Sequence, residues 1–126
     1  MADSNCVADF MVRDPECAET WQQVALARQR MLTSSFSCLP IKVKDEWKLL
    51  SDYAIAMFLA NSADPRRALR ERIATVIESN ALTLDDAILV SPKMPILEAV
   101  RTSVGRPVLV VEEGRLLGIA TPFDFL

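Results

Sequence analysis

Two side chains near the end of the sequence, Thr121 and Asp124, have the types and spacing of a ribonucleotide site. Pro122 between them favours the first turn of a helix, where the N–H groups and the helix dipole attract an anion such as phosphate. The threonine hydroxyl can bind an oxygen there, and an ionised aspartate, which only accepts hydrogen bonds, suits the hydroxyls of a ribose. The structural alternative is an N-cap threonine followed by an acid that complements the dipole.

The residues before this pair predict a β-hairpin that positions it. Residues 108–111 have the β-branched and aliphatic composition of a buried strand. The polar stretch that follows includes Gly114, which accepts the positive φ of a tight turn. Residues 116–120 then return as a second apolar strand, and Thr121 caps a short helix.

Residues 118–124, G-I-A-T-P-F-D, resemble the glycine–aliphatic–aliphatic–Ser/Thr–x–x–Asp signature of CBS domains, which are named for cystathionine β-synthase. Residues 106–110, R-P-V-L-V, resemble the strand that precedes it in the family, although the proline comes one place early. In that family the hydroxyl residue contacts the phosphate and the aspartate contacts the ribose of adenosine nucleotides. The resemblance therefore implies these roles for Thr121 and Asp124.

The same resemblance implies the remaining contacts of a nucleotide. Arg106, before the strand, would pair with phosphate in a forked geometry. Adenine would lie against aliphatic side chains, for which the candidates are Ile119, Ile88 and Leu89. For Arg106 the structural alternative is a solvated arginine at a strand entry.

The N-terminal half of the sequence contains a second, weaker copy of the CBS pattern. Residues 7–15 resemble the opening segment of the family, and residues 48–54, K-L-L-S-D-Y-A, stand where the signature should fall. Ser51 is kept, but Lys48 replaces the glycine and Ala54 replaces the aspartate. Ser51 is a candidate nucleotide contact, although a plain N-cap role is favoured because alanine cannot bind a ribose.

The two copies together imply an α+β fold of two tandem CBS repeats, small β-sheets packed on helices, related by pseudo-two-fold symmetry. The predicted first repeat is 1–62, and 63–126 holds a linker helix and the second repeat. The helix that Ser51 opens is apolar nearly all round, which predicts burial on more than one side. The other predicted helices and strands are helices 20–32, 66–79 and 94–103, and strands 36–43, 47–50 and the later part of 83–90.

Composition narrows the classes of function. The 126 residues carry a net charge of −3, which argues against general nucleic-acid binding. The sequence has no histidine, the commonest general base and metal ligand. Its three cysteines are widely spaced without a CxxC pair, which favours reduced thiols over a disulfide frame or a zinc site.

Location is predicted from the same composition. The N-terminus shows no targeting segment, and the longest apolar run, 53–60, is too short to span a membrane. With its cysteines reduced, we expect a cytoplasmic protein that has no membrane partner.

The function implied by the resemblance is regulatory. The pair would bind AMP, ADP or ATP in the cleft between its repeats, shift the shape of a homodimer and so modulate a partner protein. The alternative is a ligand-free dimerisation or interaction scaffold, which the incomplete first signature and the short final helix favour. No catalytic residue is predicted, since the sequence shows no nucleophile–base pair and no glycine-rich phosphate loop. Which nucleotide binds, and whether magnesium accompanies it, stays open.

Overall fold

The computed structural model describes residues 5–126, and the chain forms two compact units. Unit 1 combines the N-terminal segment up to Pro15 with Ala87–Leu126, and unit 2 is Glu16–Asp86. Each unit has its own small sheet and helices, which confirms the predicted α+β fold. These units differ from the predicted division between residues 62 and 63. The segment up to Pro15 belongs to the same unit as residues 87–126, and residues 63–86 belong to the same unit as residues 16–62.

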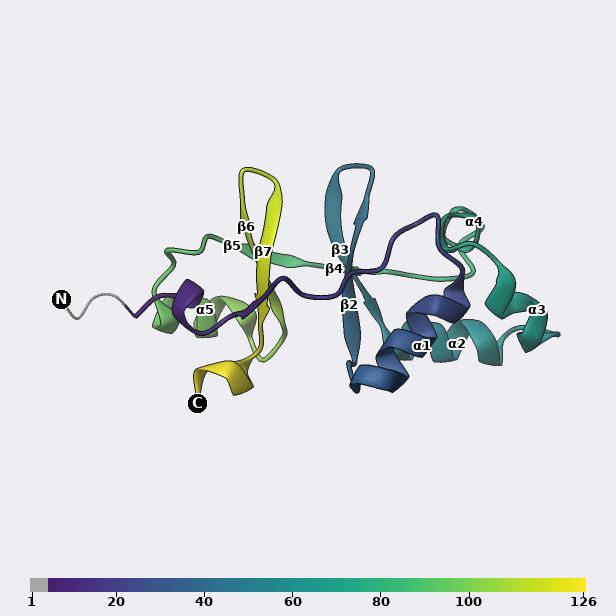
Figure 1. Ribbon diagram of the computed structural model, residues 1–126, viewed down its shortest axis with the longest axis horizontal. Helices are drawn as coiled ribbons and strands as arrows, with labels where there is room; N and C mark the ends of the chain where they lie inside the picture. Colours follow the sequence, from purple (N-terminus) through teal and green to yellow (C-terminus); the bar gives the residue numbers. More distant parts are fainter. Residues whose placement is uncertain (1–4) are drawn as a thin grey trace. The chain divides into compact units, whose positions relative to one another are not determined.

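Unit 2 packs its helices against an antiparallel sheet of strand order β2-β3-β4. Helices α1 and α2 run beside this sheet (Figure 1), and their buried side chains form one apolar core with Leu39, Ile41 and Leu50 of the strands. The elements of unit 2 are α1 (Val24–Ser34), β2 (Cys38–Val43), β3 (Glu46–Ser51), α2 (Asp52–Ala60), α3 (Pro65–Arg70), α4 (Ile73–Glu78) and β4 (Asp85–Asp86).

Local sequence signals explain most of these boundaries. Pro40 lies in β2, an edge strand, where a proline is tolerated because it has no N–H to donate. The hydroxyl of Ser51 accepts from the backbone N of Ala54 at 3.0 Å and so caps α2. Asp64 caps α3 through the backbone N of Arg67, and Pro65 takes the first helical position.

Two helix predictions in unit 2 are wrong where the two segments contact each other. The helix expected from Thr20 begins at Val24, and the one expected over 66–79 is broken into α3 and α4. The two segments exchange backbone hydrogen bonds: the N of Val24 donates to the O of Glu71 at 2.9 Å, and the N of Ile73 donates to the O of Gln22 at 2.8 Å. These groups cannot also serve helices, so tertiary pairing overrides the local helical pattern.

Helix α2 also differs from its prediction. Ile55 and Phe58 are buried against the core of unit 2, but Tyr53 is 71% exposed and Met57 44% exposed. The helix is therefore buried on one side only within this chain. Its outer face remains apolar and accessible.

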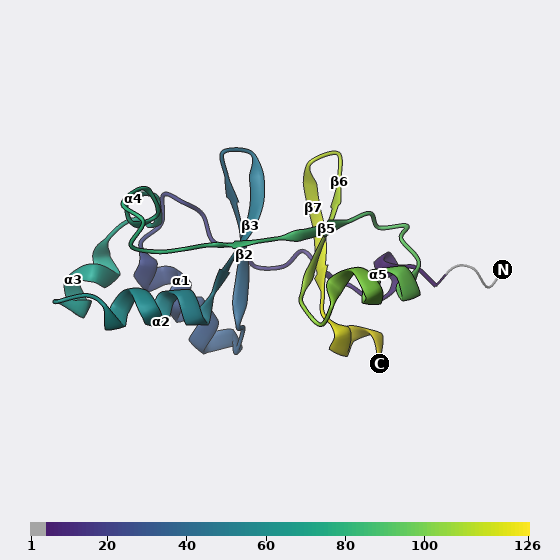
Figure 2. The same cartoon turned by 180° about the vertical axis from the view of Figure 1, so that it is seen from behind.

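Unit 1 has a four-stranded sheet of order β1-β7-β6-β5. Strands β5 and β6 are parallel and joined through α5, which packs beside the sheet, whereas β6 and β7 form a hairpin (Figure 2). Val7, Val90, Ala99, Val108 and Ala120 form the centre of its core. The elements of unit 1 are the 3-10 helix η2 (Val7–Asp9), β1 (Val12–Arg13), β5 (Ile88–Val90), α5 (Ile96–Ser103), β6 (Val108–Glu112), β7 (Arg115–Ala120) and the 3-10 helix η3 (Pro122–Phe125).

Candidate functional site at the end of strand β7

The predicted hairpin β6–β7 delivers Thr121 to the end of the sheet of unit 1. Glu112 pairs with Arg115 across a two-residue turn, in which Glu113 and Gly114 have φ of 52° and 79°. A two-residue turn with positive φ at both positions matches the twist of paired strands. Val108 and Val110 of β6 are fully buried, so the hairpin rests on the core and fixes where η3 begins.

Thr121 and Asp124 come together at this junction. The backbone N of Thr121 donates to Oδ2 of Asp124 at 2.8 Å, and its hydroxyl donates to the same oxygen at 3.2 Å. This is the arrangement of the structural alternative, an acid three residues into a turn bonding back to the capping residue. Both residues are half-buried, and within residues 5–126 no group donates to Oδ1 of Asp124. One carboxylate oxygen is thus left to accept a further hydrogen bond.

Gly118 has a structural reason to be glycine. Strand β1 pairs with β7 here, with Arg13 opposite Gly118 and Val12 opposite Ile119. A Cβ on Gly118 would lie 2.6 Å from Sδ of Met11 and 2.8 Å from the carbonyl O of Val12, closer than van der Waals contact allows. The glycine of the signature therefore lets the N-terminal segment lie against β7.

A second junction of the same kind, which the sequence analysis missed, lies in unit 1. The backbone N of Cys6 donates to Oδ2 of Asp9 at 3.0 Å, as Thr121 does to Asp124. The ring of Phe10 meets that of Phe125 edge-on with centroids 6.3 Å apart, so η2 and η3 are neighbours. The signal was present in C-V-A-D, which has the spacing of T-P-F-D.

The sheet register separates the three residues predicted to face adenine. Leu89 and Ile119 both pair with Leu109, so their side chains share one face of the sheet. Ile88 pairs with Val108 and packs against the core on the opposite face. Leu89 is 48% exposed. The register therefore places Leu89 and Ile119 on one face, on either side of Leu109, and sets Ile88 on the other face.

Of the last two candidate residues, Arg106 comes two residues before Val108, which pairs with Ala120, and Ser51 lies in the other unit. Arg106 is exposed in the connection between α5 and β6, and its backbone N donates to the O of Ser103 at 2.9 Å. Ser51 lies in unit 2 and has the N-cap geometry that the sequence favoured. Ala54 offers no carboxylate beside it.

Comparison with family models finds a match in the C-terminal part of the chain. Residues 80–126, which contain this junction, match the family model of the CBS domain. This part of the chain is similar to the CBS domain. No curated protein is similar enough in sequence to count as a match.

Solved structures extend the likeness to nearly the whole chain. AcuB from Vibrio cholerae, a protein assigned to acetoin utilization, has a TM-score of 0.75 and 19% identity over 95% of this chain and 86% of its own. Hypoxic Response Protein I, solved with two zinc ions, has a TM-score of 0.72 and 23% identity over 95% of both chains. CBSX2 in complex with AMP has a TM-score of 0.70 and 18% identity over 94% and 91%. The predicted fold of two tandem CBS repeats is thereby confirmed.

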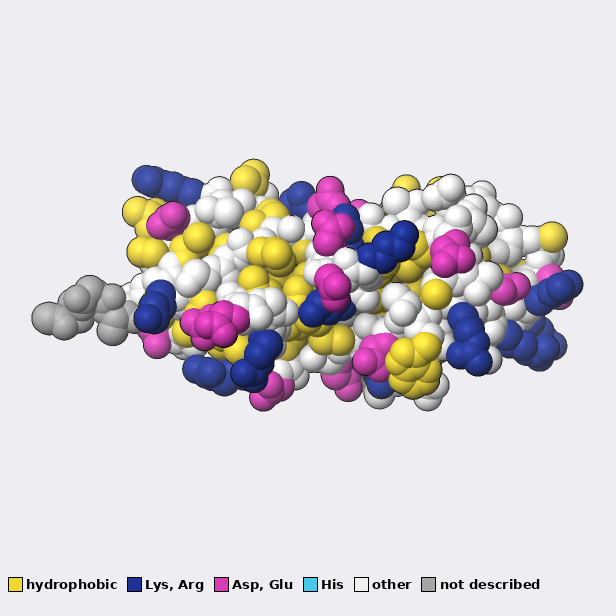
Figure 3. Space-filling model, turned by 90° about the horizontal axis from the view of Figure 1, so that it is seen from above, with side chains coloured by type: hydrophobic (Ala, Val, Ile, Leu, Met, Phe, Trp, Pro, Cys, Tyr) yellow, Lys and Arg dark blue, Asp and Glu magenta, His cyan; other side chains and the backbone are white. Residues whose placement is uncertain are grey.

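Charged groups around the CBS fold are mostly solvated. Figure 3 shows acidic and basic side chains interspersed over the viewed face, with apolar side chains between them. In unit 2, Nζ of Lys48 lies 2.6 Å from Asp86, and this hydrogen bond raises the pKa of Lys48. Burial raises the pKa of the Cys17 and Cys38 thiols, and the acids Glu19 and Asp52 add to it.

Metal-binding and membrane-spanning features were also sought. Across residues 5–126, no three acidic or cysteine side chains gather closely enough to hold a metal ion. None of the helices in that range is long and apolar enough to cross a bilayer. All three cysteines are unlinked, as the sequence predicted.

Proposed function

We propose that the CBS domain in unit 1 binds an adenosine nucleotide, AMP, ADP or ATP, at the junction of β7 and η3, and that binding regulates a partner protein. The observation that carries this proposal is the pairing of Thr121 with Asp124, which leaves Oδ1 of the carboxylate open at the end of the signature. The structural relative CBSX2 was solved in complex with AMP, which supports the choice of ligand.

The proposed contacts follow from what each group can donate or accept. Oδ1 of Asp124 would accept from a ribose hydroxyl, while Oδ2 stays bonded to the backbone of Thr121. The Thr121 hydroxyl would turn from the carboxylate to donate to phosphate, and Arg106 would add a charge-assisted bond. Leu89 and Ile119 would cover one face of adenine. Such a set gives micromolar binding, about −8 kcal/mol.

Regulation requires a ligand that distinguishes two states of the protein. We propose that the module works as a cytoplasmic homodimer without catalysing a reaction, and that nucleotide binding changes its shape. The exposed apolar side chains of Tyr53 and Met57 on α2 favour self-association, since a large apolar surface is costly to leave in water.

The second candidate function is a scaffold that binds a protein without any nucleotide. Helix α5 favours it, because its small residues Ala99 and Ser103 are buried while Leu97 and Val100 are 62% and 39% exposed. Phe123 of η3 is also 78% exposed. An amphipathic helix with its large aliphatic side chains outward is typical of a protein-binding face.

Calorimetric titration of the whole chain with AMP, ADP and ATP, with and without magnesium, separates the two candidates. The nucleotide proposal predicts micromolar binding that falls at least tenfold in Thr121→Ala and Asp124→Ala. Ser51→Ala is the matched control, because Ser51 caps the corresponding helix in unit 2, and its affinity should equal that of the parent. No heat with any nucleotide at millimolar concentration, alongside a stable dimer in sedimentation, would favour the scaffold. Recovery of unchanged nucleotide tests the absence of catalysis.

A further inference from the structure

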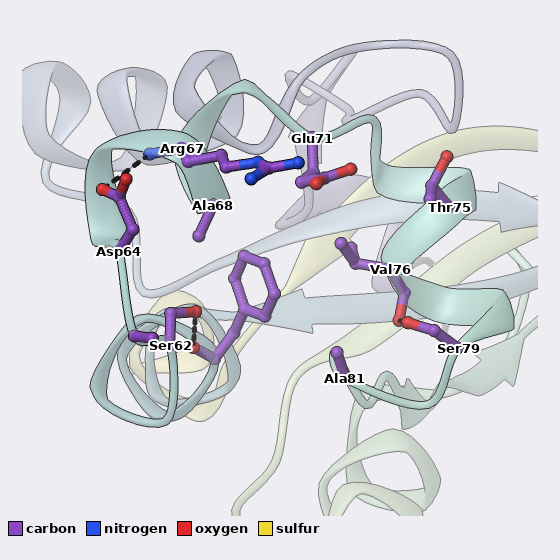
Figure 4. Close-up of a pocket in the computed structure, with 11 residues that line it drawn as sticks. Ser62, Asp64, Arg67, Ala68, Glu71, Thr75, Val76, Ser79 and Ala81 are labelled. Atoms are coloured by element: carbon purple, nitrogen blue, oxygen red, sulfur yellow. Dashed lines mark hydrogen bonds between the residues drawn. The ribbon is translucent and has the colours of Figure 1, made fainter.

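Unit 2 contains a groove that none of the predicted site residues touches. It lies among the C-terminal part of α2, helix α3 and helix α4, and its volume is about 380 Å³. Small-molecule sites are typically about 300–1,000 Å³. Its walls are drawn in Figure 4, and the lining residues are Phe58, Ser62, Ala63, Asp64, Arg67, Ala68, Glu71, Thr75, Val76, Ser79 and Ala81.

The floor of the groove is apolar and packed into the core of unit 2. Phe58, Ala68 and Val76 belong to the core of unit 2 and are 6%, 7% and 4% exposed. Each comes from a different helix, so the floor is held by the packing of α2, α3 and α4 against one another. An apolar side chain of a ligand would find a preformed surface here.

Two opposite charges line the same groove without neutralising each other. Arg67 lies on α3, and Glu71 ends that helix with an extended backbone, φ −67° and ψ 145°. Figure 4 shows the Arg67 side chain reaching along the groove toward Glu71. Among residues 5–126, neither the guanidinium nor the Glu71 carboxylate has a hydrogen-bond or ion-pair partner. A donor fork and an acceptor therefore line the same groove and remain open.

The other polar groups of the rim are mostly acceptors. The hydroxyls of Ser62 and Ser79 donate to the carbonyl oxygens of Phe58 and Val76, so their oxygens can only accept from a ligand. The Asp64 carboxylate accepts from the backbone N of Arg67 at 3.3 Å. An acceptor-rich rim with one guanidinium suits a ligand that has several N–H donors and one carboxylate.

We propose that this groove binds a free α-amino acid with an apolar side chain. The ligand carboxylate pairs with the fork of Arg67, the ammonium donates to Glu71, and the side chain lies on Phe58, Ala68 and Val76. Only a free amino acid carries both charges on one carbon, whereas a peptide terminus carries one of them. The site shares no residue with the Thr121–Asp124 junction, so it does not rest on nucleotide binding.

The probes are L-leucine and L-phenylalanine, titrated into the whole chain by calorimetry. N-acetyl-L-leucine lacks the ammonium, and L-leucinamide lacks the carboxylate. We expect each derivative to bind at least tenfold more weakly than L-leucine. Because this comparison uses the parent protein, it holds even if a variant fails to fold.

Variants assign each end of the ligand to its partner. Arg67→Gln should weaken L-leucine at least tenfold and leave the weak L-leucinamide unchanged, since that derivative has no carboxylate to lose. Glu71→Gln should likewise weaken L-leucine at least tenfold and leave the weak binding of N-acetyl-L-leucine unchanged, since that derivative has no ammonium to lose. The matched control is Arg66→Gln, an exposed neighbour on α3 outside the groove, which should bind like the parent.

Three results would overturn the proposal: no binding of either amino acid at millimolar concentration, derivatives that bind as tightly as L-leucine, or a folded Arg67→Gln with parental affinity. Asp124→Ala separates this site from the nucleotide proposal, because amino-acid binding should persist in that variant.

Discussion

The junctions β3–α2 in unit 2 and β7–η3 in unit 1 share a backbone plan and differ in their chemistry. Each ends a hairpin whose two turn residues have positive φ, and each second strand pairs antiparallel with a short strand. Lys48 stands opposite Asp86 in one pairing, and Gly118 stands opposite Arg13 in the other. At corresponding positions, unit 2 therefore has a surface ion pair, and unit 1 has a close approach of the backbone of β1 to Gly118.

The helix caps differ in the same way. In unit 2 the hydroxyl of Ser51 accepts from the backbone N of Ala54, so a neutral side chain caps the helix. In unit 1 the carboxylate of Asp124 accepts from Thr121 and keeps one oxygen open. The two junctions therefore share a backbone plan but present different side-chain groups. One residue, aspartate in place of alanine, supplies a charged acceptor that the junction in unit 2 lacks.

Gly118→Ala is the sharpest test of the strand comparison and should have the largest effect on stability. The added Cβ would meet the carbonyl O of Val12 at 2.8 Å, and that backbone cannot move without leaving β7. We expect the free energy of unfolding to fall by about 2 kcal/mol, a typical cost of overpacking, as measured by urea titration. Lys48→Ala at the matching position should cost much less, and equal costs would contradict the account.

The cap comparison predicts a smaller effect with a definite pattern. Ser51→Ala removes the side-chain cap at the backbone N of Ala54 and should cost about 1 kcal/mol. Thr121→Ala should cost less, because the backbone N of residue 121 keeps its bond to Asp124. Urea titrations of both variants decide the order, and a costlier Thr121→Ala would refute it.

The hairpin turns give a reciprocal pair of substitutions. Asp45 has φ of 65° in unit 2, where the corresponding residue of unit 1 is Gly114 at 79°. Asp45→Gly should stabilise the protein, and Gly114→Asp should destabilise it, each by about 0.5 kcal/mol, since aspartate tolerates this conformation better than most residues. Thermal unfolding measures both, and shifts of the same sign would contradict the turn assignment.

Alkaline pH should have the smallest effect, a loss of stability in unit 2. Unit 2 holds Cys17 and Cys38, whose pKa burial raises above 9.0, and Lys48, whose pKa the bond to Asp86 raises above 10.5. Because the folded state keeps these protons longer, their contribution is complete below pH 9.0 and is lost as the pH rises through the raised values.

Both tryptophans lie in unit 2, so their fluorescence reports on it. We expect its stability against urea to fall as the pH rises above 9.0, and to fall less in Cys38→Ala. An unchanged slope in that variant would rule out the thiol as a cause.

Features set by neighbouring residues were predictable from the sequence. The hairpin through Gly114, the cap at Ser51, the Asp64–Pro65 helix start and the edge position of Pro40 depend on a few adjacent side chains. The Thr121–Asp124 contact also follows from spacing, because an acid three residues after a cap reaches back to it.

Features set by distant segments were not predictable. The break between α3 and α4 depends on pairing with the segment before α1, as in the bond from Arg72 to the carbonyl of Trp21, 51 residues away. The contact of Phe10 with Phe125 joins the two ends of the chain. Strand alternation separates Ile88 from Leu89, but the sequence alone does not say which of them faces the core.

The central proposal is that Asp124 accepts a hydrogen bond from a ribose hydroxyl. The affinities for AMP and 2′-deoxy-AMP test it most directly. We predict that the parent protein binds AMP about tenfold more tightly, equivalent to about 1.4 kcal/mol for one charge-assisted hydrogen bond. In Asp124→Ala the two ligands should bind equally. A parent that does not distinguish them, or a variant that keeps the preference, would contradict the account.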